Sequence, residues 1–114
     1  MPTQLQTQVL AQLYDAKAKI SAAIAAEASK TSPDTNYIIQ LNNSLPGIDH
    51  QIAVINGQIV AADTAQMTTA STALTTAKGN LDTTLARINT AAAIITAIAA
   101  LVQAAATFAA AAAL

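Results

Sequence analysis

The segment that most constrains the fold of this chain runs from Ala91 to Leu114 and contains no charged residue. Its sequence, AAAIITAIAALVQAAATFAAAAAL, carries polar side chains only at Thr96, Gln103 and Thr107. At helical spacing its larger apolar residues form two stripes, so the helix is apolar nearly all round. Such a helix is normally buried on every side or surrounded by lipid. The rest of the chain, other copies or a bilayer must therefore supply an apolar environment.

The composition fits one helical domain, 1–114, with 91–114 as its uncharged Ala-rich helix. The chain is 54% hydrophobic, but only 3% of its residues are aromatic. Alanine favours helix because it loses no side-chain entropy there, yet it buries little area. A core of Ala, Ile and Leu therefore needs long, closely packed helices or extra area from partners. Charged residues make up 10%, against about 25% in a typical soluble domain.

Charge, cysteine content and the first residues exclude several classes of function. The net charge of −1 gives no basic footprint for nucleic acid. The absence of cysteine excludes disulfides and thiolate metal sites. The first residues lack the cationic start, apolar core and cleavage site of a Sec signal peptide. We therefore expect any release to occur by lysis, by a signal-independent route or with a signal removed before the first residue, with a membrane-associated end state.

Helical periodicity predicts two helices in the first half of the chain. Thr3 and Gln6 form a capping-box pattern that begins a helix extending to Lys30. A second helix is expected from Ser32 to Ala62, with Ser32 as its cap and Pro33 in its first position. It carries a coiled-coil-like seam of residues that recur in steps of three and four. The seam is Ile38, Leu41, Leu45, Ile48, Ile52, Ile55 and Ile59.

Two breaks in this pattern leave alternatives open. Pro46 and Gly47 lie inside the seam, so the helix either kinks there or a new helix begins at Ser44. The unbroken phase of the seam favours the kink. The turn that follows the second helix is expected between about residues 62 and 68, because the stripe shifts by one position there. Residues 78–80, Lys-Gly-Asn, are the competing turn.

These patterns predict an all-α fold: an elongated antiparallel bundle of about three long, coiled-coil-like helices. The third, beginning near Thr68, would be longer than its partners, and its overhang would fall within the apolar tail. No catalytic, cofactor or metal site is expected. His50 lies beside Asp49 without a nucleophile or further ligand, and the other carboxylates are dispersed. We therefore expect no enzyme activity and no small-molecule substrate.

The tail carries the functional hypotheses. Its 24 residues would span about 36 Å as a helix, enough to cross a hydrocarbon core of ~30 Å. Insertion of this helix alone is marginal, because its strongly apolar residues contribute only about −2 to −4 kcal/mol. The expected membrane or assembly face is Ile94, Ile95, Ile98, Leu101, Val102 and Phe108.

The first hypothesis is a membrane-active protein that oligomerises and inserts this helix. Long amphipathic helices combined with one uncharged helix make the general design similar to that of α-helical pore-forming toxins. The alternative is a structural subunit of a filament, particle or secretion-apparatus component whose apolar tails interlock. A third hypothesis is a helical partner whose tail docks in the groove of a larger protein. The expected partners are further copies of the chain, a second helical chain, or a lipid bilayer.

Overall fold

The computed structural model describes residues 3–87 and 90–113, and these form α-helices without strands. The four helices are α1 (Gln4–Ala28), α2 (Thr35–Gly57), α3 (Ala65–Ala86) and α4 (Ala91–Ala112). The prediction of an all-α fold is confirmed. The third helix predicted from Thr68 to the end of the chain is wrong, because α3 and α4 are separate helices.

Each helix begins after a residue whose side-chain oxygen accepts a backbone N–H from the first turn. This satisfies one of the N–H groups that the start of a helix leaves without a partner. The capping box of Thr3 and Gln6 is confirmed in both of its hydrogen bonds. The cap of α2 is Asp34 rather than Ser32, because the Asp34 carboxylate accepts the Tyr37 N–H at 3.1 Å. The four caps are Thr3, Asp34, Thr64 and Thr90.

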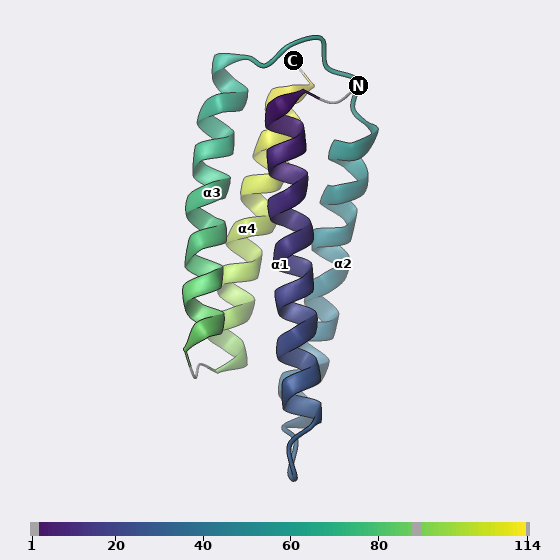
Figure 1. The fold of residues 1–114 in the computed structure, drawn as a ribbon, viewed down its shortest axis with the longest axis vertical. Helices are drawn as coiled ribbons and strands as arrows, with labels where there is room; N and C mark the ends of the chain where they lie inside the picture. The colour runs from purple at the N-terminus through teal and green to yellow at the C-terminus, as the bar shows by residue number, and fades with distance from the viewer. Residues whose placement is uncertain (1–2, 88–89, 114) are drawn as a thin grey trace.

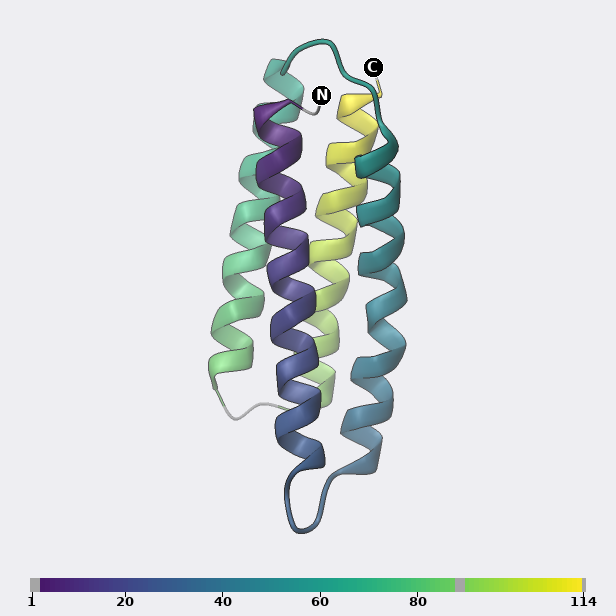
Figure 2. The same ribbon diagram turned by 45° about the vertical axis from the view of Figure 1, so that its right-hand side comes forward.

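The helices form an elongated bundle of two antiparallel hairpins, α1/α2 and α3/α4, packed so that α1 is parallel to α3 and α2 is parallel to α4 (Figures 1 and 2). Its extents are 51 × 21 × 16 Å. α1 packs against α2 and α3, and α4 packs against the same two helices. The α1/α4 and α2/α3 pairs lie diagonally across the bundle, so the segment from Gln58 to Thr64 crosses one end to join α2 to α3. The start of α1 and the end of α4 also lie at this end (Figure 1).

The expected overhang of the C-terminal helix is not found. α4 lies alongside α2 and α3, and its buried side chains contribute to the common core. The part that extends farthest is instead the hairpin between α1 and α2, around residues 29–34 (Figures 1 and 2). The physical reason is that α3 ends at Ala86 and a separate helix begins after the cap Thr90, and this helix, α4, packs against α3.

Most of the predicted seam of α2 lies in the core. Leu41, Ile48 and Ile55 are fully buried, and Ile52 is nearly so. Ile38 and Leu45 are half-buried. Ile59 is the exception: it follows the end of α2 and is 100% exposed.

A side chain from α1 binds the end of α2 at Gly57. The Gln6 amide donates to the carbonyl oxygens of Ile55 and Gln58, at 3.4 and 3.1 Å. The turn to α3 therefore begins at Gln58, a few residues before the expected position. The competing turn at 78–80 is wrong, since α3 continues through these residues. α2 also continues through Pro46, so no new helix begins at Ser44.

Candidate functional site

Helix α4 separates its side chains by size rather than by charge. Ile94, Ile98, Leu101 and Phe108 are at most 2% exposed and face the core. The opposite face carries only small or uncharged polar side chains, and we call it the small-residue face. It consists of Ala92, Ala93, Thr96, Ala99, Ala100, Gln103, Ala106, Thr107 and Ala110. The two faces of the helix therefore differ in side-chain size, and neither face carries a charge.

The two remaining members of the predicted membrane or assembly face, Ile95 and Val102, are half-buried. Val102 lies where α4 approaches α2: a Cβ atom placed on Gly47 would be 3.5 Å from its Cγ2. All six predicted residues thus lie inside the bundle or at its helix contacts. The four fully buried members can meet lipid or another copy only after α4 leaves its position. Leu114, the last residue of the predicted segment, lies outside the described residues.

Polar cross-links join α1 to α2 and α1 to α3. Lys17 on α1 and Asp49 on α2 form an ion pair at 2.6 Å. Gln12 on α1 donates to the hydroxyl of Thr75 on α3 at 3.0 Å. Together with the contacts of Gln6, these bonds hold three of the helices together without involving α4.

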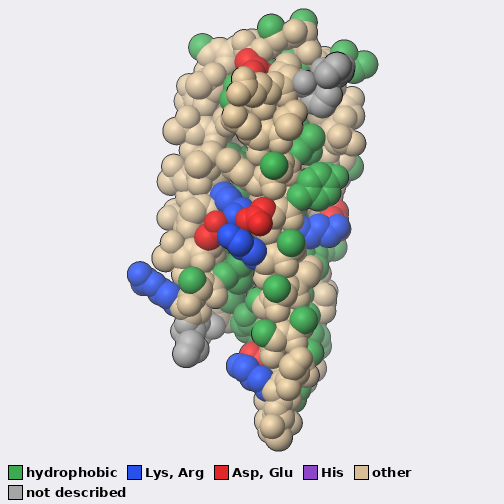
Figure 3. All heavy atoms as spheres, viewed as in Figure 1, with side chains coloured by type: hydrophobic (Ala, Val, Ile, Leu, Met, Phe, Trp, Pro, Cys, Tyr) green, Lys and Arg blue, Asp and Glu red, His purple; other side chains and the backbone are tan. Residues whose placement is uncertain are grey.

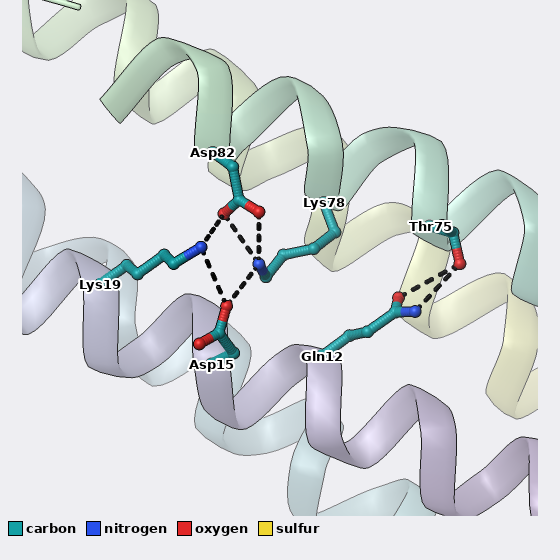
Figure 4. A network of polar contacts seen from close by, with 6 residues as sticks. All are labelled: Gln12, Asp15, Lys19, Thr75, Lys78 and Asp82. Carbon is teal, nitrogen blue, oxygen red and sulfur yellow. Dashed lines mark hydrogen bonds and ion pairs between the residues drawn. The ribbon is translucent and has the colours of Figure 1, made fainter. Parts of the chain in front are cut away.

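The largest cross-link is a group of four charged side chains between α1 and α3, which we call the ion-pair quartet (Figure 4). The ammonium group of Lys78 lies 2.6 Å from Asp15 Oδ2 and 2.7 Å from Asp82 Oδ2. Lys19 lies 3.2 Å from Asp15 Oδ2 and 3.3 Å from Asp82 Oδ1. Two cations and two anions balance, and the Lys78 side chain is only 9% exposed. The quartet therefore fixes the relative height of two parallel helices.

The quartet also shifts the protonation equilibria of Asp15 and Lys19. Hydrogen bonds from Lys78 and then Lys19 lower the pKa of Asp15 below its ordinary value. Hydrogen bonds to Asp15 and then Asp82 raise the pKa of Lys19. Both shifts favour the charged forms, so the quartet is an ion-pair network at neutral pH.

α4 is attached differently from the other three helices. It has no ionisable side chain, and its large residues make apolar contacts. Among the described residues, the backbone of α4 accepts a hydrogen bond from the segment after α2: Gln58 Nε2 donates to the carbonyl oxygen of Ala109 at 2.7 Å. Separating α4 from the bundle would break no ion pair.

The face between α3 and α4 forms a shallow groove of about 590 Å³. The side chains that line it are uncharged and mostly small: Ala65, Gln66, Thr69, Ala70, Ala73, Thr107, Ala110 and Ala111. Small side chains let helix backbones approach closely, which accounts for the extensive contact between α3 and α4. The groove carries no charge, so a second helix could approach it without desolvating ions.

His50 and the carboxylates do not gather into one site. Asp49 pairs with Lys17, while the neighbouring His50 is exposed on α2. Within residues 3–87 and 90–113, no three His, Asp or Glu side chains lie close enough to hold a metal ion.

Comparisons with protein-family models, curated proteins and solved structures give no match for this chain. α4 is the one helix among the described residues whose length and composition would suit a membrane span. In the bundle, 28% of its most apolar stretch is buried. Alanines account for most of the exposed remainder, as the small-residue face shows.

Proposed function

We propose that this protein is a non-enzymatic, membrane-active helical protein that carries α4 in a shielded position and inserts it into a bilayer as copies gather there. The observation that carries the proposal is the attachment of α4. This uncharged helix is long enough to span a bilayer and is held almost entirely by apolar contacts. The ion pairs between helices join α1 to α2 and α3 instead. Apolar contacts with lipid or with other helices can replace those that α4 loses.

The energies explain why α4 stays in the bundle in water. Its four fully buried large side chains stabilise the closed form by about 1.5–3 kcal/mol each, or about 6–12 kcal/mol together. Insertion of the helix contributes only about −2 to −4 kcal/mol. A single chain therefore keeps α4 packed. Opening requires a bilayer together with neighbouring copies, which re-cover the apolar faces that α1, α2 and α3 would expose.

The small-residue groove between α3 and α4 supports a second candidate function. Under it, the protein is a structural subunit whose copies pack through this uncharged face in an aqueous filament or particle. The groove accepts a close-packed helix as readily from another copy as from lipid-embedded neighbours. Lipid dependence separates the two candidates.

Liposome flotation of the full chain, with dye release measured on the same vesicles, tests the proposal. Membrane activity predicts that the protein floats with the vesicles and releases dye. Sedimentation without lipid is the matched measurement. Large particles that form without vesicles, combined with no flotation, would reject membrane activity and favour the structural subunit.

A further inference from the structure

The segment that crosses the end of the bundle, Gln58–Thr64, is unusually apolar for a connection. Its sequence is QIVAADT, whereas turns and loops are normally dominated by Gly, Pro, Asn, Asp and Ser. Val60 is half-buried and packs onto the core. Ile59 points the other way and is 100% exposed, the highest exposure of any large hydrophobic residue described. Packing against the core accounts for an apolar residue at position 60 but not for an isoleucine at the fully exposed position 59.

The C-terminal end of α4 lies beside this segment (Figures 1 and 2). The final turn of α4 and the crossing segment together line a hollow of about 450 Å³. Met67 and the Gln58 side chain also line it. We call this surface the apolar tip, defined as residues 59–62 together with Ala112 and Ala113.

Charge is concentrated away from the apolar tip. Among the described residues, Asp63 is the charged side chain at this end, and its carboxylate accepts the Leu5 N–H at 3.3 Å. Lys30 and Arg87 follow α1 and α3 at the opposite end. On the visible face in Figure 3 the blue side chains and most of the red ones lie over the middle and lower parts of the bundle, and one red group is seen near the upper end. The long axis of the molecule therefore runs from a charged end to an apolar one.

We propose that the apolar tip is the surface that first enters a bilayer, with Ile59 placed among the acyl chains next to the end of α4. The inference rests on the proposed function and adds to it the orientation and lipid class of first contact. Among the described residues the tip carries no cation that would attract anionic headgroups, so we expect electrically neutral lipids to suffice.

The size of the tip favours lipid over a second copy as its occupant. A stable protein interface buries about 800 Å² on each partner, far more than a few residues of one connection provide. A bilayer accepts a single apolar side chain without a complementary surface.

A single environment-sensitive fluorophore tests this placement, because the chain has no cysteine of its own. Ile59→Cys would carry the label on the tip. Ile39→Cys, near the start of α2 and 49% exposed, would carry it far from the tip. With phosphatidylcholine vesicles, we expect a blue shift and quenching by lipid-borne quenchers at position 59 before any change at position 39. A label at position 59 that stays in water while the protein floats would overturn the inference. So would a blue shift that depends on protein concentration without vesicles, since it would identify a second copy as the occupant.

Ile59→Asp, with Ile39→Asp as its control, gives an independent measure. The fully exposed Ile59 makes no core contact, so its variant should melt like the wild type. Its partition onto phosphatidylcholine vesicles should fall about 10- to 100-fold, the loss expected for one buried large aliphatic side chain. Equal partition of Ile59→Asp and wild type would overturn the tip while leaving the proposed function in place. A wild-type protein that never floats would reject the proposed function and the tip with it.

Discussion

A lysine placed at the middle of α4 should block insertion without disturbing the bundle. Ala100 belongs to the exposed small-residue face, so Ala100→Lys leaves the core unchanged. At 1.5 Å per residue, position 100 lies about 2 Å from the midpoint of the helix. A lysine at that depth costs about 2.5–3.5 kcal/mol on insertion, which corresponds to a loss of about 70- to 400-fold.

The matched control is Ala93→Lys, which is equally exposed but lies about 13 Å from the same midpoint. A lysine there can extend its ammonium group to the headgroups, so insertion should change little. Dye release against protein concentration measures both variants, and circular dichroism confirms that each remains folded. Equal dye release by the two variants would refute the reasoning, because insertion of α4 must depend on the depth of the charge. Loss of lipid-free particles in Ala100→Lys would point instead to assembly through this face.

Three further predictions concern the stability of the bundle and are checked by thermal or denaturant unfolding. Gly79→Ala should stabilise the fold by about 0.5–1 kcal/mol, because Gly79 lies inside α3 and a Cβ there meets nothing within 4 Å. A destabilised variant would mean that α3 is broken at this position. Phe108→Ala should destabilise it by about 3–5 kcal/mol through the cavity left by a fully buried ring, and a loss below 1 kcal/mol would show that α4 packs loosely. Acid should weaken the fold: the lowered pKa of Asp15 gives stability that is present above the ordinary carboxylate pKa of about 4 and is lost as the pH falls through the lowered value. Equal melting temperatures at pH 7 and pH 2 would contradict this role of the quartet.

Helical periodicity predicts the inward faces of this chain well, because burial of apolar side chains is what creates the period. Leu41, Ile48 and Ile55 lie in the core as the seam requires. The end of α2 could not be found in the same way. Ile59 continues the period although α2 has ended at Gly57, where Gln6 from α1 binds the carbonyl groups of Ile55 and Gln58. A contact between distant segments has no signature in a local repeat.

The tail shows a second limit of the sequence pattern. Counting alanine as apolar makes 91–114 uniform, whereas packing distinguishes Ala from Ile, Leu and Phe by volume. The break before α4 depends on Thr90 as a cap, and a chain so rich in threonine gives that residue little predictive weight.

The ion-pair quartet could not be predicted from the sequence either. Its two halves are visible as pairs four residues apart, Asp15 with Lys19 and Lys78 with Asp82. Their union requires α1 and α3 to lie parallel at one height, which follows only from the diagonal crossing of the connection between α2 and α3.

The proposed function requires α4 to leave the bundle at a membrane, and a reversible tether between α4 and α2 tests this step. A Cβ at Gly47 would lie 3.5 Å from Val102 Cγ2, close to the reach of a disulfide, so Gly47→Cys combined with Val102→Cys can lock α4 to α2. Each single-cysteine variant controls for the substitutions. The account predicts that the oxidised double variant still floats with vesicles through the apolar tip but releases no dye, and that reduction restores release. Equal dye release from the oxidised and reduced forms would contradict the account.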